Sequence, residues 1–212
     1  MTYTVKEIYY TIQGEGAQTG RAAVFCRFSG CNLWSGLEKD RDRAICSFCD
    51  TDFVGTNGPG GGKFDTVAAL AEAIAGHWPQ DAETSRPYVV FTGGEPLLQL
   101  DENLVRALHE KKFEVGVETN GTVRAPEGLD WICVSPKASA SVVQRQGSEL
   151  KLVYPQSEAL PERFELMDFK FFFLQPMDGA EREHNTRLVI EYCKAHPLWR
   201  VSLQTHKLVG IP

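Results

Sequence analysis

Apolar segments that end in short, polar, glycine-rich tips set the strongest limit on how this chain can fold. The apolar runs in "PYVVFTGGEP" and "FEVGVETNG" stop at glycines, and comparable tips occur at "QGEG", "SGCN", "SPK" and "QPMDG". A short apolar run bounded by turn residues is typical of a buried strand. We therefore expect a sheet whose strands each end in a polar tip.

Helical patterns alternate with these strands along most of the chain. They predict helices over 66–78, 102–112 and 181–196, the first capped by Asp65 and the second by Asp101. Strands joined by helices pair in parallel through right-handed crossovers. In contrast, the first 28 residues hold two strand-like runs with no helix between them, and "GTNGPGGGK" is expected to be a flexible loop.

The pattern amounts to about seven strands and three clear helices, too few helices for a complete eight-fold barrel. The predicted fold class is α/β, an open or partial β/α barrel, formed by a single domain over residues 1–212. In such folds the site lies at the carboxyl ends of the strands. The polar tips are therefore expected to gather on one rim.

Charge and hydropathy exclude some classes of function. The chain carries 22 Lys and Arg against 28 Asp and Glu, a net charge of −6, which argues against a nucleic-acid or anionic-membrane surface. No apolar run approaches membrane-spanning length, and the start lacks the apolar core of a secretory signal. We expect a soluble cytoplasmic protein, in which clustered cysteines are metal ligands or redox groups rather than disulfides.

Three of the six cysteines lie close together in a polar loop over residues 29–55. Fourteen residues separate Cys31 from Cys46, and two separate Cys46 from Cys49. Burial is not the evident reason for sulfur in a polar loop, so these three are candidate metal ligands. The remaining cysteines fall inside strand or helix patterns and are expected to be small buried hydrophobes: Cys26, Cys133 and Cys193.

Two kinds of metal centre are compatible with three thiolates. Structural zinc wants four ligands, but the next histidine, His77, lies on a helix beyond the loop, and Asp50 or Asp52 would make an unusual set. An iron–sulfur cluster normally takes four cysteines, so a [4Fe-4S] cluster on three leaves one iron open. An open position marks a catalytic metal site. The vacancy would then be where a small molecule binds.

The order of the motifs resembles a known superfamily. Three cluster cysteines followed by "GGEP" resemble the radical S-adenosylmethionine superfamily, although fourteen residues stand where three are usual. With "YTIQGEG", "FTGGEP", "VETNGT", "SPK" and the closing "QTHKLVGIP", the chain resembles the 7-carboxy-7-deazaguanine synthase family over almost its whole length. The resemblance implies a partial barrel of the radical S-adenosylmethionine type with a long cluster-binding loop.

The resemblance also implies a reaction. Members of this family are carbon–nitrogen lyases that contract 6-carboxy-5,6,7,8-tetrahydropterin to 7-carboxy-7-deazaguanine and release ammonia, on the pathway to queuosine and related 7-deazapurines. The implied cofactors are a [4Fe-4S] cluster on Cys31, Cys46 and Cys49, S-adenosylmethionine bound at the open iron, and Mg2+. An external electron donor such as a flavodoxin and a homodimer are expected on the same ground. No catalytic side chain is expected, because the radical arises on the cofactor.

The polar tips supply the residues expected to bind S-adenosylmethionine. "GGEP" suits the methionine amino group, since glycines let backbone carbonyls approach and Glu95 adds negative charge. "ETNGT" and "SPK" would contact the ribose or carboxylate, and "LQPMDG" the adenine. A plain turn or a gap-filling methionine is the alternative at each tip. The full expected set is Phe48, Cys49, Asp50, Gly94, Glu95, Glu118, Ser135, Pro136, Lys137, Gln175, Pro176, Met177 and Asp178.

A second set is expected to bind the pterin. Glu15 could accept from pterin N–H donors, and Gln13 can both donate and accept. Arg27 could hold the substrate carboxylate through two parallel hydrogen bonds, with a surface arginine as the alternative. The full expected set is Ile12, Gln13, Gly14, Glu15, Arg27, Thr92, His206 and Pro212.

The last residues, 204–212, are expected to fold over the substrate rather than fray, although a frayed tail is the default for a chain end. The α-carboxylate of Pro212 could accept two donors in a row from the pterin edge, and His206 could bond a ring atom. Proline would hold that carboxylate at little entropic cost because its φ is fixed.

Thr51 and Asp50 are the expected Mg2+ ligands, because hard oxygen groups beside the cluster suit this ion. A solvated loop is the alternative. Two other functions stay open at this point: an activating enzyme that places a glycyl radical on a partner protein, and a non-catalytic zinc-binding module.

Overall fold

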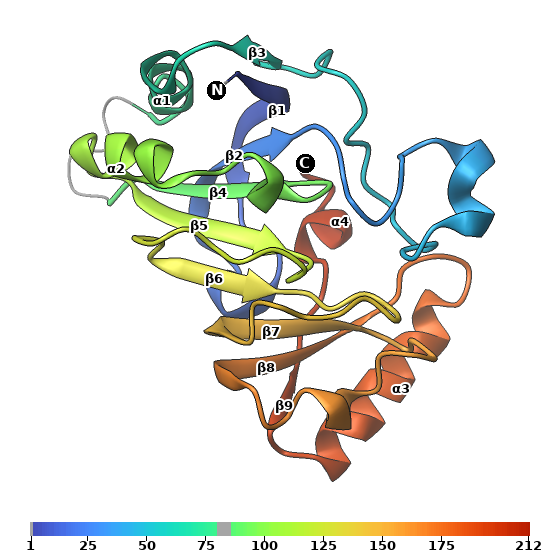
Figure 1. The fold of residues 1–212 in the computed structure, drawn as a ribbon. Coiled ribbons are helices and arrows are strands. Elements are labelled where there is room, and N and C mark those ends of the chain that lie inside the picture. The colour runs from blue at the N-terminus through green and yellow to red at the C-terminus, as the bar shows by residue number, and fades with distance from the viewer. Residues whose placement is uncertain (1, 80–85) are drawn as a thin grey trace.

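A computed structural model describes residues 2–79 and 86–212 of the chain. Within them, nine strands form one open sheet in the order β3-β1-β2-β4-β5-β6-β7-β8-β9 (Figure 1). The strands are β1 Tyr3–Ile12, β2 Ala22–Phe28, β3 Gly62–Phe64, β4 Tyr88–Gly93, β5 Glu114–Thr119, β6 Trp131–Val134, β7 Gln146–Tyr154, β8 Asp168–Pro176 and β9 Trp199–Val201. The helices are α1 Val67–Ala75, α2 Glu102–Glu110, α3 Arg182–Ala195 and α4 Thr205–Val209.

The pairing confirms the parallel sheet expected from alternation. β1 pairs antiparallel with β2 and β3, and every other neighbouring pair from β2 to β9 is parallel. The carboxyl ends of β4 to β8 therefore lie along one edge, as the polar tips require. The sheet is mixed and does not close into a barrel.

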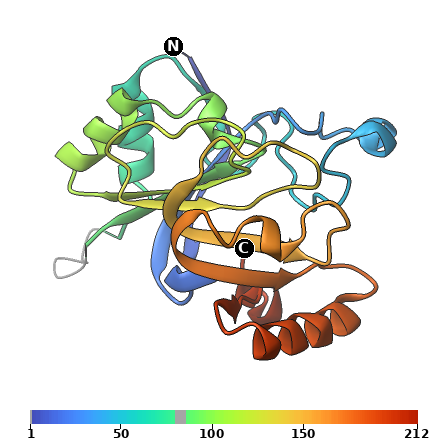
Figure 2. The same ribbon diagram turned by 60° about the horizontal axis from the view of Figure 1, so that its bottom comes forward.

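Two apolar cores lie between the sheet and its helices. One joins α1 and α2 to β1, β2, β4 and β5, and the other joins α3 to β7, β8 and β9 (Figures 1 and 2). Side chains alternate along a strand. In β7, Leu150 and Leu152 therefore face the second core, whereas Glu149 and Lys151 face the opposite side. The side of the sheet away from these cores carries polar groups such as Glu149 and Lys151, together with a small apolar cluster in which Ala23, Tyr88 and Val90 pack against Phe25.

Several details differ from the sequence prediction. The glycine-rich segment was expected to be a loop throughout, but β3 begins at Gly62, because β1 supplies antiparallel partners for its backbone. The first helix is capped by Thr66, whose side chain accepts from Ala69 N at 3.1 Å, and not by Asp65. The cap at Asp101 is confirmed by its hydrogen bond from Leu104 N.

Short helices also lie where none was predicted, and two of them belong to the cluster loop and the tail. The cluster loop contains a 3-10 helix, Glu38–Arg43, and the tail contains α4. Both are too short to show an apolar period that could be read from sequence. Over the described residues, none of the helices has both the length and the apolar character needed to cross a membrane.

Candidate active site

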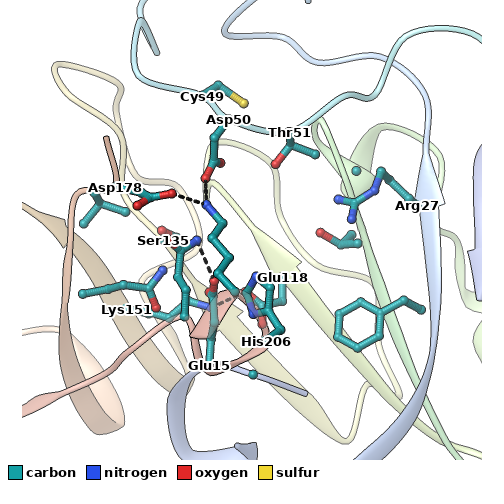
Figure 3. A pocket seen from close by; sticks show the side chains of 18 of the residues that line it. Glu15, Arg27, Cys49, Asp50, Thr51, Glu118, Ser135, Lys151, Asp178 and His206 are labelled. Atoms are coloured by element: carbon teal, nitrogen blue, oxygen red, sulfur yellow. Dashed lines mark hydrogen bonds and ion pairs between the residues drawn. The ribbon is translucent and has the colours of Figure 1, made fainter. Parts of the chain in front are cut away.

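A cavity of about 430 Å³ opens at the carboxyl ends of the parallel strands (Figure 3). Its wall is drawn from β1, β2, the cluster loop, the tips of β4 to β8 and the tail. All eight residues expected to bind the pterin line it. Of those expected to bind S-adenosylmethionine, these line it: Phe48, Cys49, Asp50, Gly94, Glu118, Ser135, Lys137, Gln175, Pro176, Met177 and Asp178. Both expected sites thus share one cavity. Glu95 and Pro136 lie outside its lining.

The three loop cysteines are near one another, and Cys46 and Cys49 line the cavity, whereas Cys31 lies outside its lining. All six cysteines are free thiols, and Cys46 is buried while Cys31 and Cys49 are half-buried. The Cys46 thiol donates a hydrogen bond to Cys49, which lowers the pKa of Cys49 to about 6 and raises the pKa of Cys46. Burial raises the pKa of Cys31, and the nearby Cys49 raises it further. Three interacting thiols, one already inclined to ionise, are a donor set that suits an iron–sulfur cluster.

These thiols are not arranged around a single ion. Within residues 2–79 and 86–212, no group of three or more histidine, cysteine, aspartate or glutamate side chains is placed to hold one metal ion. Structural zinc needs its four ligands to meet at one point. The described residues therefore contain no four-ligand set of the structural zinc type.

The "GGEP" motif joins the cluster loop to the sheet. A Cβ on Gly94 would lie 2.2 Å from Gly30 O and 2.6 Å from the Cys31 Cβ, so only glycine permits this approach. The Glu95 carboxylate is fully buried and accepts from Leu97 N at 2.9 Å, the Thr119 hydroxyl at 2.7 Å and Asn120 N at 2.8 Å. Glu95 therefore fixes the tip of β4 to the tip of β5. Its expected contact with the methionine amino group stays a prediction.

A buried lysine that sequence reasoning missed organises the floor of the cavity. Lys151 Nζ lies 2.5 Å from Glu15 Oε2 and 2.6 Å from Glu118 Oε2 (Figure 3). Gln13 donates to the other oxygen of Glu118 at 2.9 Å. Burial alone would raise the pKa of Glu15, but the charge and hydrogen bond of Lys151 lower it to about 2. The one signal in the sequence was a lysine between Leu150 and Leu152 in a strand.

This network changes the surroundings expected for Glu118. The sequence placed Glu118 beside the ribose of the cofactor, whereas the structure pairs it with Lys151 and with Gln13, a residue expected to bind the pterin. Its contact with the cofactor stays a prediction. Its neighbours belong to the substrate side.

Arg27 lies on the opposite wall (Figure 3). Its Nε donates to Glu7 Oε1 at 2.7 Å and its Nη2 to the Tyr9 hydroxyl at 2.9 Å. These two partners hold the guanidinium, whose side chain is 17% exposed. The structure thus keeps Arg27 in the cavity as a held cation rather than a free surface arginine.

The tail lies against the end of β1. Thr205 N donates to Gly14 O at 3.0 Å, the Thr11 hydroxyl donates to the main-chain oxygen of Pro212 at 3.0 Å, and Gln204 Nε2 donates to Glu15 Oε1 at 3.1 Å. Both tail residues expected to bind substrate, His206 and Pro212, line the cavity.

A lysine in the tail forms an ion pair with Asp50, one of the expected Mg2+ ligands. Lys207 Nζ lies 2.5 Å from Asp50 Oδ2 and 2.7 Å from Asp178 Oδ2. The Asp50 carboxylate is therefore committed to an ammonium group in this structure. Thr51 lies beside it in the cavity wall.

Comparison with known proteins places these features in context. No model of a known protein family matches the chain. The chain is similar to 7-carboxy-7-deazaguanine synthase from Caulobacter vibrioides, with 61% identity over 212 residues and 100% of both chains covered. It is equally similar to the 7-carboxy-7-deazaguanine synthase from Bordetella pertussis, again 61% identical with full coverage of both. The crystal structure of QueE from Escherichia coli is similar in fold, with a TM-score of 0.72, 28% identity, and 97% of this chain and 95% of that chain covered.

Proposed function

The chain belongs to the 7-carboxy-7-deazaguanine synthase family, and on that premise we propose that it contracts 6-carboxy-5,6,7,8-tetrahydropterin to 7-carboxy-7-deazaguanine with release of ammonia. The step belongs to queuosine biosynthesis. The observation that carries the proposal is the single cavity in which a C-x-x-C segment meets the "IQGEG" segment and the tail. A radical made at one wall would then be within reach of a substrate held at the other.

The cofactors of a radical S-adenosylmethionine enzyme fit one end of this cavity. Cys31, Cys46 and Cys49 would hold the [4Fe-4S] cluster. When bound, this cluster supplies the electron that cleaves S-adenosylmethionine. The residues proposed to hold the cofactor around it are the tips of β4 to β8 that line the wall, with Lys137 and Ser135 already joined by a 2.5 Å hydrogen bond.

The other end of the cavity provides charged groups for the pterin. Glu15 and Glu118 flank the Lys151 ammonium, and their carboxylate oxygens can accept hydrogen bonds from a ring N–H or an exocyclic amine. Arg27, opposite them, is proposed to hold the substrate carboxylate. Thr92, His206 and Pro212 would complete the enclosure. The tail over residues 204–212 then acts as a cap.

Mg2+ is proposed to bind the Thr51 hydroxyl and the substrate carboxylate, since this ion keeps most of its waters and needs few protein ligands. Asp50 would reach the ion only by giving up Lys207. The same proposal includes an external electron donor such as a flavodoxin and a homodimer. It also includes a single domain over 1–212 and the partial-barrel character of the open sheet.

One incubation tests the reaction. The purified protein is reconstituted with iron and sulfide under anaerobic conditions and mixed with reductant, S-adenosylmethionine, Mg2+ and carboxytetrahydropterin. Mass spectrometry is expected to find 7-carboxy-7-deazaguanine, with ammonia released in equal amount. If S-adenosylmethionine is cleaved only when a protein substrate is added, the chain is an activating enzyme. A colourless protein that contains zinc would be a structural module.

A further inference from the structure

Arg41 lies in the fourteen-residue stretch that separates Cys31 from Cys46, on the 3-10 helix Glu38–Arg43. Its Nη1 donates to two backbone carbonyls, Ser47 O at 2.8 Å and Cys49 O at 3.0 Å. Both acceptors lie within the C-x-x-C segment, of which Cys49 is the last residue. One guanidinium therefore bridges the segment that carries two of the three thiols.

The guanidinium is itself held on two other sides. Its Nε lies 2.8 Å and 2.9 Å from the two carboxylate oxygens of Glu38. Its plane lies over the ring of Trp34, with the guanidinium carbon 4.1 Å from the ring centroid. Trp34 is only 8% exposed and packs edge-on against Phe53, with ring centroids 5.6 Å apart. These contacts fix where the guanidinium points.

The contacts of Arg41 differ in how much each contributes to holding the C-x-x-C segment. Glu38 is 78% exposed, so its ion pair with Arg41 contributes little. The two bonds to carbonyls are charge-assisted and come from a planar guanidinium. They also act on backbone, so they limit the main-chain conformation of the C-x-x-C segment directly. Within the described residues, the structure records no other hydrogen bond to the carbonyl of Ser47 or Cys49.

We propose that Arg41 is a positioning residue that fixes the Cys46–Cys49 segment for cluster binding, and that the long spacing between Cys31 and Cys46 serves to deliver this guanidinium. The proposal rests on the [4Fe-4S] cluster of the proposed function. A shorter connection has no room for a helical turn that carries Arg41 to the two carbonyls while Glu38 and the Trp34 ring hold its guanidinium. Ile45 N donates to Leu33 O at 3.1 Å and closes this stretch at its base, so it behaves as a folded unit.

The test compares Arg41→Met with Arg43→Met. Both remove one positive charge from the same 3-10 helix, but Arg43 is exposed, and among the described residues no hydrogen bond or ion pair is recorded for its side chain. Each protein is reconstituted anaerobically, and two quantities are measured: iron and sulfide per chain, and the rate of cluster loss to a chelator. We expect Arg41→Met to lose its cluster about tenfold faster than the parent, because two charge-assisted hydrogen bonds are gone. Arg43→Met should keep the parental rate.

Two further variants keep the proposal open to refutation if Arg41→Met does not fold. Arg41→Lys retains the charge and a donor for one carbonyl, so its rate of loss should fall between parent and Arg41→Met. Glu38→Gln should differ little from the parent. Folding is checked by the thermal unfolding of each protein before reconstitution. Positioning is checked by the electron paramagnetic resonance signal of the reduced cluster with and without S-adenosylmethionine, which should change in Arg41→Met and be restored in part by Arg41→Lys.

Parental iron content and release rate in Arg41→Met, or equal losses in Arg41→Met and Arg43→Met, would overturn the proposal. If Arg41→Met is unfolded, a parental release rate in Arg41→Lys would overturn it instead. The outcome is independent of the reaction, since cluster retention needs no pterin. A parent protein that holds its cluster but makes no deazaguanine would contradict only the proposed function.

Discussion

The cluster loop, residues 29–55, and the tail, residues 204–212, both reach the cavity, and different kinds of contact hold them there. Much of the loop is held by its own residues: Arg41 bonds the carbonyls of Ser47 and Cys49, and Trp34 packs on Phe53. Lys6, buried on β1, ties its far end down by donating to Asp52 Oδ2 at 2.7 Å and Val54 O at 2.9 Å.

The tail depends on the rest of the molecule instead. Its recorded bonds to Gly14, Glu15 and Thr11 all end on the β1 strand and the turn after it. Lys207 then joins the tail to the loop at Asp50. The difference indicates that the loop's own contacts hold much of the C-x-x-C segment, whereas the tail is placed by the wall of the site.

The largest effect is expected from the loop thiols. Replacement of Cys31, Cys46 or Cys49 by alanine should abolish cluster assembly, because each removes one of three iron ligands. Iron per chain after reconstitution is the measurement. The matched controls are alanine at the remaining cysteines, which should keep the parental iron content: Cys26, Cys133 and Cys193. Loss of iron in any control would break the ligand assignment and with it the description of the loop.

Gly14→Ala should displace the tail without touching the loop. A Cβ at Gly14 would lie 2.3 Å from His206 Nδ1 and 2.8 Å from His206 N, so α4 must move. Overpacking of this kind costs about 1–3 kcal/mol, so the KM for the pterin should rise about tenfold or more. Iron content should be unchanged.

Gly76→Ala is the control for this variant, because the nearest atom to a Cβ there is 3.4 Å away and its φ of −65° suits alanine. Its KM should match the parent. If Gly14→Ala also loses its cluster, the loop and the tail are not held independently.

Thr51→Ala sharpens the comparison at the boundary between the two segments. Loss of the hydroxyl should raise the Mg2+ concentration needed for half-maximal turnover by about tenfold, or about 1.4 kcal/mol, with iron content unchanged. Thr56→Ala, further along the same connection, is the control. Parental Mg2+ dependence in Thr51→Ala would remove the hydroxyl from the proposed ligand set.

The smallest effect is expected from Lys207, which links the tail to the cluster loop. Lys207→Met removes two ion pairs that are partly exposed, so the KM for the pterin should rise only about two- to fivefold at low salt. The difference from the parent should shrink as salt is added. Lys194→Met, which breaks one exposed pair on α3, should leave KM unchanged. A loss of activity beyond tenfold would mean that Lys207 touches substrate or cofactor.

Much of the fold was predictable because it rests on local patterns. The apolar runs of β4 and β5 and the Asp101 cap each depend on residues adjacent in sequence. The burial of the two strands and the hydrogen bond of the cap could therefore be predicted. β3 was missed because it has only three residues and begins with a glycine, which has no strand preference of its own, and because its partner β1 is distant in sequence. Thr66 and Asp65 are both good caps, and only the direction of the chain at that point selects between them.

The polar tips, the three cysteines and the tail could be assigned from the sequence by itself, since each is a short motif whose chemistry needs those residue types. Only the tertiary structure decided how they combine. Lys151 stands between two leucines in the sequence. In the structure, its side chain extends from β7 to Glu15, in the turn after β1, and to Glu118 on β5. Glu95 carries the charge expected of a cofactor contact, but it is buried behind the wall of the cavity and accepts hydrogen bonds from three donors. The reason is physical: the type of a side chain fixes what it can bond, whereas its partner depends on which strands the sheet brings side by side.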